Sequence, residues 1–324
     1  MKAKPFLSTS LIAIFLILTL FIFYAGFSQE AYPISVYYFH DCDPSQLPLY
    51  TALENGYFKT EKIDVTLSWS IDVDVNIQNV AEHPDIDLIV VGRAQFYNLE
   101  DKYPDLFNVF NFNVQDGTRW NDAVVVKKDS EIKSLGQLRG KTIGIITDGS
   151  NWGARGEIIK IILEKNGLNP EDFKIMITTM NDFENNQVDA LYMRGPLLSL
   201  FLYLGKTMIL EEGPIFAKYI FGPWPMSVSA LSSKIIKESP DVAERVVRVW
   251  DRAINYIREN PVEADEILQR CMEKTFGVKD LPVRRLNYWT SKEINQTLIQ
   301  NQLDWYYSKG FLSRKLNVAD ILSG

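Results

Sequence analysis

The sequence predicts an α/β protein built from two lobes, and two observations support this prediction. First, the chain has 324 residues, which is more than most single hydrophobic cores accommodate, so two lobes are expected. Second, short β-branched runs alternate with segments of helical periodicity along most of the chain, and long helices follow near its C-terminus. This order is typical of largely parallel sheets whose strands are joined by crossover helices.

The clearest strand-helix unit spans residues 141–167. An apolar run at 142–146 predicts a buried strand, and residues 147–151 are turn or N-cap types. The helix expected next has apolar residues on one face and ends before Gly167, which suits a C′ glycine. Because the first amides of a helix are unpaired, this loop is suited to bind an anion or a polar group. An ordinary strand-to-helix turn is the alternative, and the loop lacks the sequence of a P-loop.

The N-terminal third begins with further strands and helices of this kind. Strands are predicted at residues 34–39, 63–69, 86–91 and 106–114. Pro48 opens a short helix that Gly56 closes. Residues 71–77 alternate as a strand would, but an α/β pattern requires a crossover helix before the next buried strand. We therefore predict a helix that begins near Asp74.

The remainder of the chain continues the pattern and ends in long helices. Strands are predicted at residues 122–127, 142–146, 173–177, 188–192 and 226–231, with a helix at 197–204. Ser239 is expected to cap a long amphipathic helix whose first residue is Pro240. Thr290 and Glu293 form a capping box, which predicts that the last long helix starts there and reaches Gly310.

The N-terminus has the features of a targeting segment. Lys2 and Lys4 precede an apolar, charge-free run at residues 11–27, and residues 26–28 offer a weak cleavage site. The run is long for a signal peptide and short for a membrane span, so residues 1–28 are either a cleaved signal peptide or a retained anchor. Both predict an extracytoplasmic protein, in the periplasm or on the outer face of the cell membrane, that contacts the membrane only through such an anchor.

Charge and residue content argue against several functions. The formal net charge is −7, or −9 without the two lysines of the N-terminal segment, which disfavours nucleic-acid binding. With only two histidines and no recognisable nucleophile or carboxylate pair, we expect no catalytic residues, no metal and no cofactor. Cys42 and Cys271 allow a disulfide in an oxidising compartment, but nothing in their spacing requires one.

Several segments resemble the extracytoplasmic solute-binding proteins of ABC importers of the nitrate, sulfonate and taurine type, which are related to thiamine-pyrimidine precursor binding proteins. The similar segments are PLYTALENGYF at 48–58, residues 124–130 with 132–135 and 138–144, Val-Asp-Ala at 188–190, Ser-Pro-Asp at 239–241, and residues 260–264. Their order and spacing extend the resemblance over roughly residues 34–315.

The resemblance implies a two-lobe fold of the periplasmic-binding-protein type, with the ligand cleft between the lobes and two chain crossings. We expect the crossings near Asp122–Lys127 and Met226–Leu231. Lobe 1 then comprises residues 29–126 and 227–324, and lobe 2 residues 127–226. In such proteins the ligand contacts both lobes and favours the closed state, which the permease subunits of the importer recognise. We expect a monomer.

Loops at the carboxyl ends of strands line the ligand crevice in open α/β sheets, and they supply the candidate residues. The predicted ligand-binding residues are His40, Arg93, Gln95, Trp120, Asn121, Gly149, Ser150, Asn151, Trp152, Tyr192, Arg194 and Trp224. Ser150 and Asn151 combine short polar side chains with a helix N-terminus, and Arg93 and Arg194 suit an acidic ligand. Each also has a structural interpretation: a helix cap, an ion pair or, for the tryptophans, core packing.

Three functions are compatible with these features. The leading interpretation is a binding protein that captures a small organic or inorganic anion, such as a sulfonate, taurine or nitrate, by lobe closure and delivers it to an ABC importer. The aromatic residues of the loops favour instead a flat heterocycle such as a thiamine pyrimidine. An enzyme similar to the thiamine-pyrimidine synthase would need a cysteine-rich iron-binding segment, which two distant cysteines do not supply.

Overall fold

The computed structural model describes residues 30–39, 42–70, 73–146 and 152–322. The predicted targeting segment, residues 1–28, lies outside this part of the chain. Among the helices that are described, none combines the length and the apolar character needed to span a membrane.

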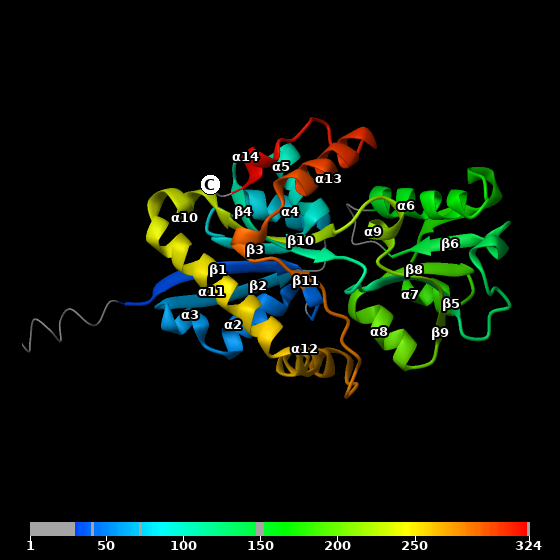
Figure 1. The fold of residues 1–324 in the computed structure, drawn as a ribbon, viewed down its shortest axis with the longest axis horizontal. Coiled ribbons are helices and arrows are strands. Elements are labelled where there is room, and N and C mark those ends of the chain that lie inside the picture. Colours follow the sequence, from blue (N-terminus) through cyan, green and yellow to red (C-terminus); the bar gives the residue numbers. More distant parts are fainter. Residues whose placement is uncertain (1–29, 40–41, 71–72, 147–151, 323–324) are drawn as a thin grey trace, which may run out of the picture.

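The first lobe is built on a six-stranded mixed sheet (Figure 1). Its strand order is β11-β4-β10-β3-β1-β2. The strands are β1 (Tyr32–Phe39), β2 (Ile63–Ser70), β3 (Leu88–Gly92), β4 (Phe107–Gln115), β10 (Trp224–Ser232) and β11 (Asn287–Tyr288). β1 pairs in parallel with β2 and β3, whereas β10 runs antiparallel to both β3 and β4. The parallel part therefore has its strand ends, and the loops that follow them, on one edge.

Helices cover both sides of this sheet. They are η1 (Pro44–Gln46), α2 (Leu47–Glu54), α3 (Tyr57–Thr60), α4 (Val73–Glu82), α5 (Arg93–Lys102), α10 (Ser233–Glu238), α11 (Pro240–Glu259), α12 (Pro261–Phe276), η4 (Ser291–Glu293), α13 (Gln296–Ser308) and α14 (Val318–Ile321). The long helix α11 packs with α2, α3 and α12, and α5, α13 and α14 pack against β10 and β4 on the other side (Figure 1). The fully buried Trp250 of α11 lies edge-on to Phe58 and Phe110, so it anchors that helix in the core.

The second lobe is built on a five-stranded sheet in the order β7-β6-β8-β5-β9. Its strands are β5 (Asp122–Lys127), β6 (Thr142–Ile145), β7 (Lys174–Ile177), β8 (Ala190–Arg194) and β9 (Thr207–Glu212). Its helices are η2 (Leu135–Leu138), α6 (Trp152–Lys165), η3 (Pro170–Asp172), α7 (Met180–Glu184), α8 (Gly195–Tyr203) and α9 (Ile215–Tyr219). β6 is parallel to both β7 and β8, and β5 is antiparallel to β8 and β9.

The chain passes between the two sheets twice. It leaves the first sheet after β4 and enters the second at β5, and it returns from β9 to β10. Residues 116–121 and 220–223 therefore connect the lobes, and the whole of strand 122–127 belongs to the second sheet. The predicted two-lobe α/β fold with two crossings is confirmed.

The caps of two predicted helices differ from the structure. The helix after Ser239 begins at Pro240 as predicted, but the serine side chain makes no cap hydrogen bond. Its Oγ lies 3.1 Å from the hydroxyl of Tyr32, a contact 207 residues distant in sequence. A tertiary partner has thus replaced the local one.

The ambiguous segment at 71–77 resolves as predicted, because helix α4 begins at Val73.

The capping box formed by Thr290 and Glu293 caps a shorter element than predicted. The backbone N–H of Thr290 donates to the Glu293 carboxylate at 2.8 Å, but this box heads only the 3-10 turn η4. The last long helix begins later, at Gln296, where Asn295 Oδ1 accepts a hydrogen bond from the N–H of Leu298 at 3.0 Å. Asn295 is the better N-cap because it directly precedes the helical run.

A disulfide joins Cys42 to Cys271 across 229 residues of sequence. It ties the segment after β1, at the edge facing the second lobe, to helix α12. The sequence allows this bridge without requiring it, and the structure forms it. A disulfide of this kind is typical of proteins in oxidising compartments.

Candidate functional site

Three arginines from both lobes come together between the two sheets. Arg93 begins α5 directly after β3, Arg194 ends β8, and Arg155 lies in the first turn of α6. Burial lowers the pKa of Arg93, and the charge of Arg194 adds to that effect. Burial raises the pKa of Tyr306 in α13, and the charges of all three arginines oppose that rise. The region between the lobes therefore concentrates positive charge on the buried Arg93 and Arg155 and the half-buried Arg194.

Arg93 is held in a cage of aromatic rings. Its side chain is only 5% exposed, and its Nη1 donates to the carbonyl of Met226 at 3.4 Å. The guanidinium carbon lies 5.0 Å from the ring centre of Phe216, 5.5 Å from that of Trp224 and 5.9 Å from that of Tyr306. Phe216 lies in α9 of the second lobe, whereas Trp224 begins β10 and Tyr306 lies in α13, so rings from both lobes hold the guanidinium through cation–π attraction.

The buried carboxyl group of Asp122 lies within electrostatic reach of Arg194 and Arg93. It accepts hydrogen bonds from the hydroxyl of Tyr192 at 2.8 Å and from the backbone N–H of Ile215 at 3.2 Å. Burial raises the pKa of Asp122, while these two bonds and the charges of Arg194 and Arg93 oppose that rise. Burial and Asp122 together raise the pKa of Tyr192 well above its ordinary value. Tyr192 is thus a neutral donor that holds this carboxylate.

Two of the predicted polar residues, Asn121 and Gln95, contact other protein groups around this cluster. The side chain of Asn121 accepts a hydrogen bond from Gln115 Nε2 at 2.6 Å, and its carbonyl accepts the N–H of Gly195 at 2.8 Å. Asn121 therefore ties the first crossing to the start of α8. Gln95 is buried, and its Oε1 occupies the space that a Cβ at Gly92 would enter, at 2.1 Å. These contacts favour positioning roles for both side chains.

The predicted tryptophans at the crossings are packed by other protein groups. Arg284 lies over the ring of Trp120 with its guanidinium carbon 4.4 Å from the ring centre. Trp224 is fully buried, stacked on Phe216 at 5.0 Å and edge-on to Trp305 at 5.5 Å. Both arrangements favour the packing interpretation over an exposed wall for a ligand.

The remaining predicted residues belong to the loops that follow β1 and β6. His40, Gly149, Ser150 and Asn151 lie outside the described residues, and for Trp152 the structure describes the backbone at the start of α6 but not the side chain. Their proposed contacts with a ligand stay predictions.

Arg155 and Tyr306 are the two site residues that the sequence analysis missed. Arg155 carried one usable signal: a cation in the first turn of a helix is unfavourable to the helix dipole, so it suggests another purpose. Its Nη1 donates to the carbonyl of Ile146 at 2.6 Å, which turns it back toward the carboxyl end of β6. Tyr306 carried no signal, because only tertiary folding brings α13 to the arginines.

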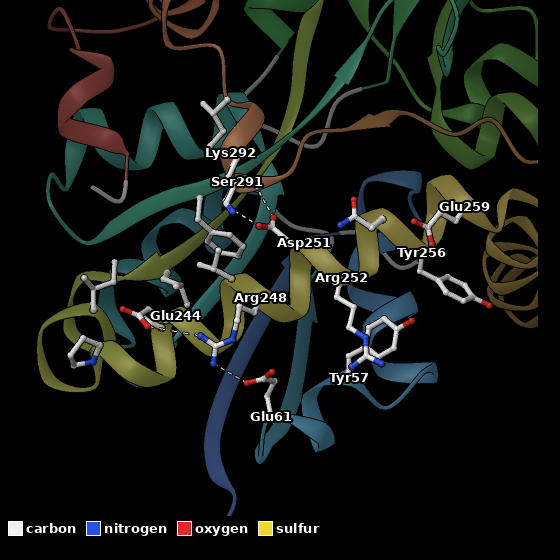
Figure 2. Close-up of a pocket in the computed structure, with 18 residues that line it drawn as sticks. Tyr57, Glu61, Glu244, Arg248, Asp251, Arg252, Tyr256, Glu259, Ser291 and Lys292 are labelled. Atoms are coloured by element: carbon white, nitrogen blue, oxygen red, sulfur yellow. Dashed lines mark hydrogen bonds and ion pairs between the residues drawn. The ribbon is translucent and has the colours of Figure 1, made fainter.

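The described residues also form a groove of about 1130 Å³ on the outer side of α11 (Figure 2). Two of its arginines contact other lining side chains. Arg248 contacts Glu61 at 3.0 Å, and the guanidinium carbon of Arg252 lies 3.9 Å from the ring centre of Tyr57. None of the predicted site residues lines this groove or a second pocket of about 480 Å³ near Arg258. The groove is therefore separate from the arginine cluster.

Among the described residues, no three His, Cys, Asp or Glu side chains are grouped so that they could hold a metal ion. The chemistry that the described site offers is charge and hydrogen-bond donation from arginine and tyrosine.

The two sheets, the two crossings and the buried polar cluster between them define a two-lobed protein of the periplasmic-binding-protein class. The sequence model of the NMT1/THI5-like family matches residues 43–264. The chain belongs to this family, which confirms the resemblance found from its sequence segments. No curated protein sequence matches the chain.

Solved structures share the fold over nearly the whole chain. The periplasmic aliphatic sulphonate binding protein SsuA from Escherichia coli matches with a TM-score of 0.67 and 14% identity, over 90% of this chain and 97% of that one. The alkanesulfonate-binding protein SsuA from Xanthomonas axonopodis pv. citri, bound to MOPS, matches with 0.65 and 15%, over 91% and 99%. The enzyme DszB in complex with biphenyl-2-sulfinic acid matches with 0.67 and 13%, over 89% and 96%. At these identities the likeness concerns the fold.

Proposed function

We propose that this protein binds a small organic oxyanion of the sulfonate type between its lobes. In this proposal it acts as an extracytoplasmic solute-binding protein that delivers the anion to the permease subunits of an ABC importer. The observation that carries the proposal is the convergence of Arg93 from the first lobe with Arg155 and Arg194 from the second.

Electrostatics supply the physical reason. Like charges held close together in a poorly solvated region repel one another, and an anion between them turns that repulsion into attraction. The guanidinium groups offer planar forks of N–H donors that match the oxygens of a sulfonate. Because the donors come from both lobes, one anion contacts both, and its binding favours the closed arrangement.

Three further observations support the proposal. Each of the three structural relatives described above is named for, or was solved with, a sulfur oxyacid. The disulfide suits an extracytoplasmic location. The polar cluster supplies cationic donors, while Asp122 already accepts two protein hydrogen bonds, so the described site favours binding over acid–base catalysis.

Two alternatives remain testable. The second candidate is a flat heterocycle such as a thiamine pyrimidine, which the aromatic residues of the predicted ligand loops favour, although the rings around Arg93 are already filled by its guanidinium. The other alternative is turnover of a sulfur compound, because the fold is shared with DszB, a desulfurization enzyme.

Titration calorimetry in a sulfonate-free buffer separates these candidates. The panel comprises taurine, MOPS, nitrate, sulfate and a neutral aminopyrimidine, and the titrated compound is recovered and identified by mass spectrometry. We expect a sulfonate to bind most tightly and to be recovered unchanged. Tightest binding of the aminopyrimidine favours the heterocycle, and chemical conversion of the recovered compound overturns the binding-protein interpretation.

A further inference from the structure

Helix α13 belongs to the first lobe by its packing. The hydroxyl of Tyr97 in α5 donates to Gln302 Oε1 at 2.8 Å, and Gln302 Nε2 donates to the carbonyl of Pro225 in β10 at 3.1 Å. Gln302 is fully buried. The middle of α13 is therefore fixed to the elements that carry Arg93.

The end of α13 reaches the second lobe. Lys309 Nζ lies 2.5 Å from Glu157 Oε1 in α6. The ring of Phe311 lies against Gly153, where a Cβ atom would be only 2.8 Å from Phe311 Cε1. Gly153 and Glu157 are four residues apart and so share one face of α6. One face of α6 thus meets one turn of chain from the other lobe (Figure 1).

A helix C-cap directs this turn. Gly310 has a φ of +73°, the left-handed conformation that ends many helices. Its N–H donates to the carbonyl of Tyr307 at 2.9 Å, and the N–H of Phe311 donates to that of Tyr306 at 3.0 Å. The reversed chain brings Phe311 within 5.8 Å of the ring of Trp305 and 5.9 Å of that of Tyr306. The position of the contact is therefore set by the first lobe.

We propose that residues 309–311 form an interlobe latch that stabilises the closed arrangement of the two lobes. The latch holds α6, which carries Arg155, against the lobe that carries Arg93, so it brings the two arginines to one place. Its effect on lobe closure does not depend on a ligand. Its effect on ligand affinity rests on the proposed function. If the ligand binds the closed state, a lower population of that state lowers the apparent affinity for the ligand.

The variant Gly153→Ala tests the steric part of the latch. Alanine is a better helix former than glycine, so α6 itself is not weakened, yet the added methyl group collides with Phe311. Gly136→Ala is the matched control, because a Cβ at Gly136 meets no atom within 4 Å. In ligand-free protein we expect faster amide hydrogen exchange in residues 305–311 and a larger radius of gyration for Gly153→Ala, with the control unchanged.

Charge reversal tests the ionic part. Lys309→Glu and Glu157→Lys each replace the ion pair by a repulsive pair, and the double variant restores an ion pair of opposite polarity. We expect each single variant to weaken the binding of MOPS about threefold to tenfold, and the double variant to recover most of that loss.

The outcomes separate the latch from the proposed function. If Gly153→Ala and both single charge variants match the parent in exchange and in radius, the latch is refuted whatever the ligand is. Single variants that open the ligand-free protein, together with a double variant that closes it again, support the latch. If that result comes with no binding of MOPS even by the parent, the sulfonate proposal fails while the latch stands.

Discussion

Replacement of Glu100 by glutamine should raise the stability of the protein at alkaline pH and leave it unchanged at acidic pH. Glu100 lies near the end of α5, the helix that carries Arg93, and its side chain is only 3% exposed. Burial raises its pKa to about 7, although the nearby guanidinium of Arg314, 3.3 Å away, opposes that rise. The protein therefore holds a carboxyl group that resists ionisation in the folded state.

The sign and size of the effect follow from linkage. Below pH 4.5 the carboxyl group of Glu100 is protonated in both the folded and the unfolded state, and its contribution to stability is fully present. Between an ordinary value of 4.5 and about 7 the unfolded chain releases the proton while the folded protein retains it. Stability therefore falls as the pH rises through this window. At about 1.4 kcal/mol per pKa unit, a rise from 4.5 to about 7 corresponds to a loss of roughly 3–4 kcal/mol above pH 7.

Urea unfolding at pH 4.5 and at pH 8 measures this difference. We expect Glu100→Gln to be more stable than the parent by about 2–4 kcal/mol at pH 8 and equal to it within about 0.5 kcal/mol at pH 4.5. Glu131→Gln is the control, because Glu131 is exposed. An equal effect at both pH values, or a loss of stability at pH 8, contradicts the reasoning.

Three further predictions concern Ser150, the disulfide and the N-terminal segment. Ser150→Ala should weaken anion binding by about 1.5–3 kcal/mol if Ser150 contacts the charge, whereas a change in melting temperature alone identifies a helix cap. Replacement of both Cys42 and Cys271 by serine should cost about 2–5 kcal/mol in urea unfolding, and a cost below about 1 kcal/mol would show that the bridge adds little. A chain that begins at Gln29 should be soluble and melt cooperatively, and an insoluble product would refute the assignment of residues 1–28 as a targeting segment.

The fold was predictable from the sequence because its signals are local. Periodicity and the need for crossover helices identified the α/β order, including the helix at Val73 that alternation alone would have made a strand. The strand-end rule also predicted that Arg93 and Arg194 lie at the carboxyl ends of strands, in the candidate ligand region. Both are found where β3 and β8 end.

The features that the sequence did not predict depend on contacts between distant parts of the chain. Tyr306 joins the arginines only because α13 packs on α5 through Tyr97 and Gln302. Ser239 exchanges its expected cap bond for a contact with Tyr32. A local pattern carries no information about such partners, so these roles emerge only from the folded structure.

The affinity of Arg155→Gln for MOPS, measured by titration calorimetry beside the parent, tests the central claim most directly. Arg155 supplies charge from the second lobe, and loss of a charge-assisted hydrogen bond is expected to cost about 1.5–3 kcal/mol, or roughly tenfold to hundredfold in affinity. Arg248→Gln, in the separate groove along α11, is the control and should bind as the parent does. If Arg155→Gln binds MOPS as tightly as the parent and the control, the arginine cluster is not the anion site.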